Sequence, residues 1–510
     1  MSKFVASTLY RRRRAINAVL ALFLVFSIGC SDDPGEEQNA NQSQIDAGDA
    51  DIEPSPDAAP EDATSPNDAE VNDADATAEE DTGTDVGTDV GTDADENGEP
   101  EPQYTDELSQ FGITWTFDDD VQYGQFANGD YWVVGPATIV DIDPSSEEDD
   151  GRTMNGSMIN PVAENGSTQG YDSAMAVSSY DADMNVALDV STDSPLVVEP
   201  GSSLVSTITI EEEEHRPQIS DSAVLTVLEE AAAEGSFRPP YSGDDKAIEF
   251  NLDDLDYSRL ERLDLVDGTP DMADIESKFE RPWVDHIPNW NGREAYPSNN
   301  MPGYGREIAR DVGMGALMLN LDFSDEEKQT LLTSFVQLGI DYHAVAIHGG
   351  DANWAPNGGH ASGRKFPILF AGMLLDDDEM KAIGDDDEIL FGEDAQTFYV
   401  EETAPGEYNG GHGGYTEEHE GMAEWGIRHA TDRSRDDVDW GASYRRCCTA
   451  NAWGGFVLAA HIMDAVELWN HDALFDYQDR YMDIEEPGDY NRSWDRPFSE
   501  EMWDTYRDDY

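Results

Sequence analysis

Three of the ten histidines lie within one short stretch of the chain, HAVAIHGGDANWAPNGGHASGRK, from His343 to Lys365. This stretch leaves an apolar helical pattern, passes through glycine, asparagine and proline, and re-enters an apolar run at Phe366. A loop of this composition between two helices contributes little to a core, so its polar side chains are expected to face a ligand. A second loop, EYNGGHGGYTEEHEG (Glu407–Gly421), repeats the same residue types. Together the two loops predict a shared ligand-binding site.

Polar side chains without an obvious structural task form four clusters, each just before or after an expected helix. A fold that gathers these helix ends at one rim would bring the clusters together. Three tyrosines compete for a proton-transfer role, because a phenol can act as an acid or as a base. The clusters contain Trp290, Asn299, Asn300, Tyr304 and Arg306; Asn357, His360 and Arg364; Tyr408, His412, Tyr415, Glu418 and His419; and Tyr444, Arg445, Arg446, Asn451 and Trp453.

Structural roles compete with these functional ones. Asn300 could do no more than order the turn at Pro302-Gly303, and Arg364 could pair with one of the many carboxylates. His360 follows two glycines in a loop, where packing explains it poorly, so a functional role is favoured.

A metal centre is a second interpretation of the histidines. His412 and His419 flank Glu418, and His348 and His360 could add ligands. The chain contains neither His-Glu-x-x-His nor Cys-x-x-Cys, the patterns of many zinc sites. It also has no Gly-x-Ser-x-Gly elbow and no phosphate-binding loop. We therefore expect no required cofactor and no catalytic metal, and a structural ion stays open.

The elements expected to position these clusters are helices. Apolar residues at helical spacing predict helices over 222–233, 305–319, 324–346, 366–375, 377–383, 417–430, 443–469 and 472–482. The sequence SDEE at 324–327 is a capping-box pattern, and 443–469 is apolar nearly all round, which predicts burial on several sides. Long helices joined by irregular loops predict a mainly α fold, with helical hairpins closing into an α/α toroid over 221–510.

Residues 106–220 have the period of strands instead. Ile113, Trp115 and Phe117 alternate with polar residues, and turn signals separate the β-rich runs 131–134 and 138–142. Another such run covers 203–210. These runs predict an N-terminal antiparallel β-sandwich-like domain ahead of the toroid.

The first 105 residues predict export and tethering. Four arginines (11–14), an apolar run (15–28) and Ser27-Ile28-Gly29-Cys30 resemble a bacterial lipoprotein signal peptide, 1–30, with lipidation at Cys30. Residues 31–105 carry 25 acidic and no basic side chains, which predicts a disordered acidic linker. We expect a membrane-anchored lipoprotein of the bacterial outer membrane that faces the periplasm or the cell surface.

The remaining chain is also acidic, with 86 Asp and Glu against 24 Lys and Arg. This balance argues against nucleic-acid binding, which requires basic surface. An acidic polymer would be repelled at low salt. A site for such a polymer therefore needs locally concentrated arginine and histidine.

The layout of these residues resembles the α/α-toroid polysaccharide lyases, which include alginate-lyase-like and heparinase-like enzymes. Three features carry the resemblance: Asn299-Asn300 before a helix, the Gly-Gly-His loop at 410–412, and the block YRRCCTANAW…ELWNHDALFDYQDRYM at 444–482. These three features look most like those of polysaccharide lyase family 38 and its relatives. The resemblance covers about 282–482. The N-terminal domain lies outside it, and the acidic surface departs from what a uronate-binding protein leads one to expect.

The resemblance implies β-elimination from a uronic acid. A base removes the proton at C5, amide or cationic groups stabilise the charge that develops at the carboxylate, and an acid supports the departing O4. It implies that Asn300 and His360 hold the carboxylate. It also implies that Arg364 neutralises charge and Tyr415 transfers the proton. The substrate-binding residues expected beside them are Trp290, Tyr304, Arg306, Asn357, His412, Tyr444 and Arg445.

The sequence thus predicts a polysaccharide lyase acting on an acidic, uronate-containing polysaccharide. One alternative is a glycoside hydrolase on the same toroid, which would use two carboxyl groups from among Asp351, Glu418 and Glu424. The other is a surface glycan-binding lipoprotein without catalysis.

Overall fold

The computed structural model describes residues 101–163, 168–175, 179–212, 217–287, 297–300, 306–354, 356, 358–360, 362–411, 413–426, 449–484 and 497–510. All of them belong to one compact unit that spans 89–510. Of the described residues, 37% are helical and 24% lie in strands. The prediction of a mainly α fold is therefore wrong. The predicted signal peptide, Cys30 and most of the predicted linker lie outside the described residues.

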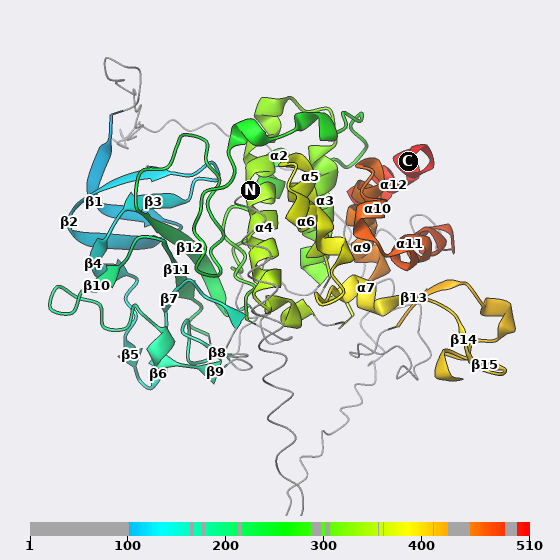
Figure 1. Cartoon of the computed structure of the whole chain (residues 1–510), viewed down its shortest axis with the longest axis horizontal. Coiled ribbons are helices and arrows are strands. Elements are labelled where there is room, and N and C mark those ends of the chain that lie inside the picture. The colour runs from blue at the N-terminus through cyan, green and yellow to red at the C-terminus, as the bar shows by residue number, and fades with distance from the viewer. Residues whose placement is uncertain are drawn as a thin grey trace, which may run out of the picture. The chain divides into compact units, whose positions relative to one another are not determined.

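A large curled mixed sheet forms the N-terminal part, drawn blue to green in Figure 1. Its strands follow the order β10-β4-β2-β3-β12-β11-β7, and β1 pairs with β2 beside this path. Neighbours are antiparallel except β3 and β12, which are parallel. The strands are β1 (Gln103–Gln110), β2 (Ile113–Gln125), β3 (Tyr131–Val134), β4 (Ala137–Asp143), β7 (Ser157–Ile159), β10 (Leu196–Val198), β11 (Ser202–Thr209) and β12 (Ile219–Leu228).

The predicted strands are present, but they form one curled sheet and not the predicted antiparallel sandwich. Ile113, Trp115 and Phe117 are buried on one face of β2, as their alternation predicts. Alternation identifies a strand with one buried face. It does not show whether that face meets a second sheet or the concave side of the same sheet, so the sandwich did not follow from the pattern.

The helix predicted over 222–233 is wrong, because Ile219–Leu228 is strand β12, paired with β11 and β3. Most of β12 is buried on both faces. Val224 and Val205 pack with residues of the helical part, whereas Leu225 packs on the other side of the sheet. A short apolar run buried on both faces looks the same in sequence whether it forms a strand or a helix.

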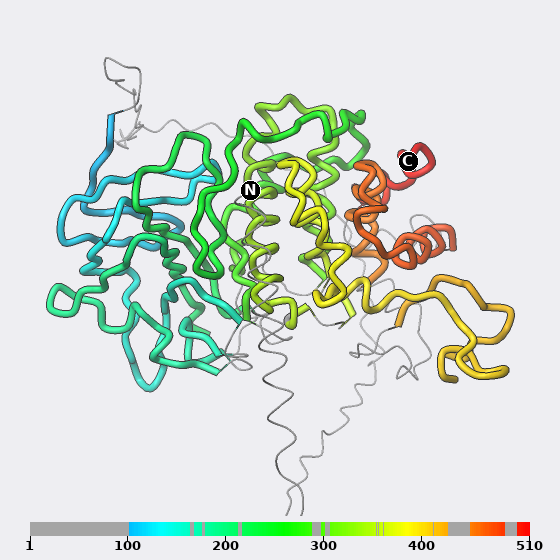
Figure 2. The backbone as a smooth tube through the Cα atoms, in the orientation of Figure 1, coloured from blue at the N-terminus to red at the C-terminus, as the bar shows by residue number. Residues whose placement is uncertain are grey.

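The helices follow the sheet in the chain, and Figure 2 traces the passage from blue through green to red. Those predicted over 305–319, 324–346, 366–375 and 472–482 are confirmed within two residues. Ser324 caps α4 in a capping box with Glu327, as its pattern predicts. The α helices are α2 (Met272–Glu276), α3 (Arg306–Leu319), α4 (Asp325–Ile347), α5 (Lys365–Leu374), α6 (Asp378–Lys381), α7 (Gly392–Gln396), α9 (Ala450–Ile462), α10 (Val466–Trp469), α11 (Asp472–Ile484) and α12 (Pro497–Tyr506).

Several short elements complete the chain and correct two further helix predictions. Within the described part of 417–430, a 3-10 helix and strand β16 replace the predicted helix. The described part of 443–469 forms two helices, α9 and α10. The short strand pairs are β5 (Glu148–Asp149) with β6 (Arg152–Thr153), β8 (Thr168–Gln169) with β9 (Ser179–Tyr180), β13 (Thr397–Tyr399) with β16 (Ala423–Trp425), and β14 (Glu402–Ala404) with β15 (Glu407–Tyr408). The 3-10 helices are η2 (Ala182–Met184), η3 (Leu252–Asp254), η4 (Tyr257–Arg259), η6 (Gly350–Trp354), η7 (Ala382–Asp385), η8 (Asn409–Gly411), η9 (Glu417–His419) and η11 (Arg507–Asp509).

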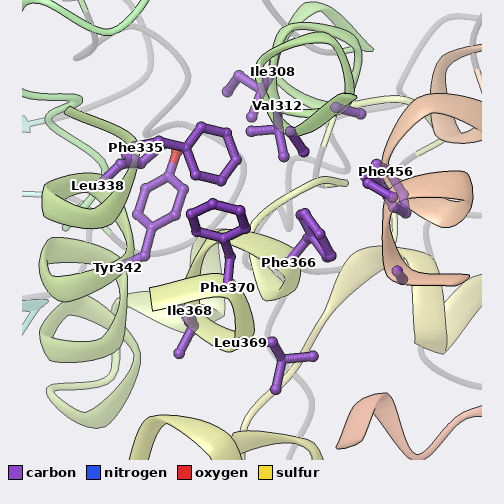
Figure 3. Packing of buried hydrophobic residues seen from close by; sticks show 14 of the residues in the cluster. Ile308, Val312, Phe335, Leu338, Tyr342, Phe366, Ile368, Leu369, Phe370 and Phe456 are labelled. Atoms are coloured by element: carbon purple, nitrogen blue, oxygen red, sulfur yellow. The ribbon is translucent and has the colours of Figure 1, made fainter. Parts of the chain in front are cut away.

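The helices pack in pairs, α3 with α9 and α4 with α5, and do not form the predicted α/α toroid. Aromatic rings fill the space between them, and Phe335 meets Phe370 with ring centroids 4.8 Å apart (Figure 3). Glycine permits the close approach of α4 to α5, because a Cβ at Gly339 would lie 2.2 Å from the carbonyl oxygen of Pro367. No helix in the described part of the chain has the length and apolar character needed to span a membrane.

A buried ion network joins the sheet to α4. The Arg238 guanidinium donates from Nε to Asp130 Oδ2 at 2.6 Å and from Nη2 to Asp341 Oδ2 at 2.6 Å. All three side chains are almost fully buried. The Gln337 amide also exchanges two hydrogen bonds with the Arg238 backbone. These contacts fix the segment after β12 against α4, and that segment carries residues of the candidate site.

Candidate functional site

The loop first singled out in the sequence is held by a buried ion pair. Arg364 precedes α5 and donates from Nε to Asp285 Oδ2 at 3.0 Å. Its Nη1 donates to the carbonyl oxygens of His360 at 3.1 Å and Ser362 at 2.9 Å. Both members of the ion pair are nearly inaccessible to solvent. The Arg364 charge is thus balanced by Asp285, while its hydrogen bonds set the path of the loop that carries His360.

Asp285 also anchors the other side of the loop. Trp354, in η6, donates its indole N–H to the same Asp285 Oδ2 at 2.9 Å. The Asp285 backbone N–H donates to the Tyr241 hydroxyl oxygen at 3.0 Å, and that hydroxyl donates to the Trp283 carbonyl at 3.3 Å. Asp285 Oδ2 therefore accepts hydrogen bonds from two loop residues, Trp354 and Arg364.

His286 follows Asp285 and is buried, with 1% of its surface exposed. Among the residues that the structure describes, neither of its ring nitrogens has a hydrogen-bond partner. Burial lowers the pKa of His286 to about 3, so the ring is neutral at pH 7. The η6 end of the loop passes beside it, because a Cβ at Gly350 would lie 3.4 Å from the His286 Cα.

Two tyrosine rings flank His286. Tyr171 and Tyr241 each meet the imidazole edge-on, with ring centroids 5.9 Å away. Burial raises the pKa of both phenols, so both carry their protons at neutral pH. The arrangement is a buried aromatic cluster in which a neutral imidazole packs between two protonated phenols.

A buried carboxyl group lies on the other side of the loop. Glu393, in α7, accepts the Gly363 backbone N–H at Oε2 at 3.3 Å, and within the described ranges its Oε1 has no partner. Burial and the neighbouring Asp394 raise the pKa of Glu393 to about 7, although Lys365 and Arg364 oppose the rise. Gln396 in the same helix donates to the Gly358 carbonyl at 3.0 Å. Helix α7 therefore supports the loop and presents a carboxyl group that titrates near neutrality.

The four predicted catalytic residues fall in three settings. His360 and Arg364 are brought together by the hydrogen bond between them. Both ends of the Asn300 amide are paired with Arg281: Asn300 Nδ2 donates to the Arg281 carbonyl at 2.9 Å, and Arg281 Nη1 donates to Asn300 Oδ1 at 3.3 Å. The Tyr415 ring lies against Phe398 and His419, with centroids 6.4 and 5.8 Å away.

The other predicted site residues either pair with neighbouring side chains or backbone, are exposed, or lie outside the described part of the chain. Arg306 donates from Nε to Glu307 Oε1 at 3.1 Å, at the start of α3. Among the hydrolase candidates, Asp351 accepts the Leu390 backbone N–H at 3.0 Å and Glu424 pairs with Arg480 at 3.1 Å, while Glu418 is exposed. Trp290, Asn357, His412, Tyr304, Tyr444 and Arg445 lie outside the described residues.

Metal binding finds little support in the described part of the chain. There, no group of three or more His, Cys, Asp or Glu side chains is placed to hold a metal ion. His343 lies in α4, and burial lowers its pKa to about 4. Asp285 accepts a hydrogen bond from Arg364, and Glu393 accepts one from the Gly363 backbone N–H. Both carboxyl groups therefore bind the loop itself.

Sequence reasoning missed Asp285, His286, Tyr171 and Glu393. A signal for the first two was present, because Asp285-His286 interrupts the apolar residues Trp283, Val284 and Ile287 just ahead of the Trp290 cluster. Tyr171 and Glu393 have no such signal, since each reaches the site only through tertiary packing.

The described site thus combines a loop held by a buried ion pair, the half-buried His360 on that loop, and a buried carboxyl group, Glu393, whose pKa is raised to about 7. Searches of protein-family models, curated proteins and solved structures found no match to this chain.

Proposed function

We propose that this chain is a polysaccharide lyase that cleaves an acidic, uronate-containing polysaccharide by β-elimination. The observation that carries the proposal is the loop of the half-buried His360, which the buried Arg364–Asp285 pair holds in place. β-Elimination needs one group that accepts a proton and one that donates a proton at neighbouring atoms of the substrate.

In the proposed reaction a base removes the C5 proton of the uronic acid residue. The electron pair of that C–H bond forms the C4=C5 double bond, the C4–O4 bond breaks, and an acid protonates the departing O4, with Tyr415 as the predicted proton-transfer residue. His360 is proposed to contact the substrate carboxylate, where developing charge must be stabilised. Arg364 is proposed to hold the loop, because Asp285 already balances its charge.

The role proposed for Asn300 also changes, because its amide is already paired within the protein. Both ends of its amide are occupied by Arg281, which supports a structural role next to the sheet. Tyr415 stays a prediction as the proton-transfer residue. The resemblance that implied these roles rested on a toroid, and the proposal now rests on the loop that carries His360.

We also propose that the chain acts as an outer-membrane lipoprotein anchored at Cys30, with the acidic segment 31–105 as its tether. The basic, apolar and small-residue order of 11–30 supports the anchor. We propose no required cofactor.

The test is a product assay on the full chain without its lipid. The protein is incubated with alginate, glucuronan, pectate and glycosaminoglycans, and the ultraviolet absorbance of the unsaturated uronate is followed. The wild type is expected to produce this absorbance on at least one polymer, and His360→Gln is expected to lose it. The matched control is His461→Gln, because the His461 ring packs on Phe475 away from the loop of His360. Absence of unsaturated product on every polymer would contradict the proposal.

A glycoside hydrolase is the second candidate, and Glu393 favours it. A buried carboxyl group whose pKa is raised to about 7 suits the general acid of glycoside hydrolysis. New reducing ends without ultraviolet absorbance, lost in Glu393→Gln, would support this candidate. Binding of a polymer with neither product would support a glycan-binding protein.

A further inference from the structure

We propose that the side chains of Lys365 and Asp394 are joined by an amide bond that the protein forms itself, with Glu393 relaying the protons. Lys365 begins α5, at the end of the loop that carries His360, and the two acidic residues are neighbours in α7. The bond is a covalent modification site that does not depend on the proposed activity on polysaccharide. It ties the end of the His360 loop to α7.

The ammonium group of Lys365 lies against the Asp394 carboxylate in a setting with little access to water. Lys365 Nζ donates to Asp394 Oδ2 at 2.6 Å. Of the two side chains, 3% and 17% are exposed. Phe391 and Trp469 also place their rings beside Nζ, with centroids 5.2 and 5.5 Å away. The two groups that form an amide are therefore in contact and largely desolvated.

Burial distinguishes this pair from an ordinary surface ion pair. Moving one proton from the buried ammonium to the carboxylate removes two charges that have lost their hydration. It leaves a neutral amine beside a neutral acid, the pair that can condense. The fixed contact supplies the proximity that an amine and an acid lack in solution. Lys381 makes a similar contact with Asp376, at 2.7 Å, but 83% of that aspartate side chain is exposed. We therefore expect the Lys381 pair to stay ionic.

Trp469 is placed to bind the amide as well as the ion pair. Its indole Nε1 donates to Asp394 Oδ1 at 2.7 Å, and its carbonyl oxygen accepts from Lys365 Nζ at 2.6 Å. An amide formed between these side chains keeps one acceptor, Oδ1, and one N–H donor. These are the two atoms that Trp469 already contacts. The indole N–H also stabilises the negative charge that develops on Oδ1 when the nitrogen attacks.

Glu393 is the neighbouring group that can carry the protons. It is fully buried, and its Oε2 accepts the backbone N–H of Gly363, two residues before Lys365, at 3.3 Å. Burial and the adjacent Asp394 raise its pKa to about 7, while Lys365 opposes the rise. A carboxyl group that titrates near neutrality can take a proton from the nitrogen and pass it to the leaving oxygen.

The condensation balances without a further reactant. The Lys365 nitrogen forms a bond to Asp394 Cγ, and the bond from Cγ to Oδ2 breaks. The ammonium group starts with three protons and the amide keeps one. The other two leave with Oδ2 as water. Glu393 receives and returns protons, so it ends in the state in which it began.

The test is the intact mass of the purified full chain without its lipid, measured after unfolding. The wild type is expected to be lighter than its sequence by the mass of one water molecule. Lys365→Arg and Glu393→Gln are expected to keep the full sequence mass, because each removes a reacting or proton-carrying group. Lys381→Arg is the matched control from the exposed pair, and it should show the same loss of water as the wild type.

Peptide mapping then assigns the loss to these two side chains. Trypsin cleaves after free lysine, so the unfolded wild type should resist cleavage after Lys365 and give one branched peptide that contains Lys365 and Asp394. Glu393→Gln should be cleaved after Lys365.

A wild type at its full sequence mass would overturn the inference without reference to any variant. Loss of water that maps to other residues would overturn it as well. A cross-link that still forms in Glu393→Gln would overturn the part assigned to Glu393. None of these measurements depends on turnover, so failure here leaves the proposed function to its own product assay.

Discussion

Replacing Asp285 by alanine should destabilise the protein more than most single substitutions do. Asp285 is 1% exposed, and its Oδ2 accepts hydrogen bonds from Arg364 Nε at 3.0 Å and Trp354 Nε1 at 2.9 Å. Asp285→Ala leaves the Arg364 guanidinium buried without the carboxylate that it pairs with. The indole N–H of Trp354 also loses its acceptor.

The expected cost follows from these contacts. Removing one partner of a buried ion pair costs about 3–5 kcal/mol, because the remaining charge stays out of water. Asp285→Asn keeps an acceptor oxygen and should cost about 1.5–3 kcal/mol, the range of a hydrogen bond to a charged group. Asp285→Leu combined with Arg364→Met should recover much of the loss, since two apolar side chains leave no buried charge.

The assay is urea unfolding at pH 7, comparing transition midpoints at an unchanged slope. The control is Arg262→Ala, which breaks an exposed pair with Asp325, both side chains being more than half exposed. That substitution should cost less than about 1 kcal/mol. The reasoning would be refuted if Asp285→Ala cost no more than the control, or if the double variant were less stable than Asp285→Ala.

Three further predictions concern titration, charge and packing. His286→Phe should keep the stability of the wild type at pH 7, because it removes two buried ring nitrogens for which the described residues supply no hydrogen-bond partner. The folded pKa of His286, about 3, lies below the ordinary value of 6.5, so the wild type should lose stability as pH falls from 6.5 towards 3 and the variant less so. Urea midpoints at pH 7 and pH 4 would show the difference. Glu393 should give the opposite dependence of stability on pH. Its folded pKa of about 7 lies above the ordinary 4.5, so the wild type should lose stability as pH rises from 4.5 to about 7. Glu393→Gln should reduce this loss in unfolding measured at about pH 5 and about pH 8. The third prediction is that Gly339→Ala should destabilise the α4–α5 contact by about 1–3 kcal/mol in thermal unfolding, because its Cβ would lie 2.2 Å from the Pro367 carbonyl oxygen; an unchanged Tm would contradict the close packing.

Local patterns predicted the long elements well. Helix α4 begins at its capping box, and α3, α5 and α11 match their apolar periodicity. These signals act within a few residues along the chain, so one sequence carries them completely. The buried alternation of Ile113, Trp115 and Phe117 is of the same kind.

Assembly of the elements was predicted poorly. Strand β12 is a short apolar run, which periodicity does not separate from a buried helix, and its pairing with β3 and β11 depends on strands far away in the chain. The toroid failed for a similar reason, since helical hairpins form locally while closure of a ring depends on contacts between distant hairpins. The pattern of α3 does not specify that it packs on α9, although that pair is a main contact of the helical part.

The sequence by itself determined that the stretch from His343 to Lys365 is unusual. Its glycines and histidines, and the apolar runs on either side of it, are local properties of the chain. The sequence also determined the acidic balance of the chain and the order of strands before helices. Only the tertiary structure decided which residues meet that loop. Asp285 reaches Arg364 across 79 positions of the chain, and Tyr171 reaches His286 from the curled sheet. Such contacts depend on the packing of the whole unit, because burial and the removal of water from charged groups are properties of the folded chain and not of any short segment.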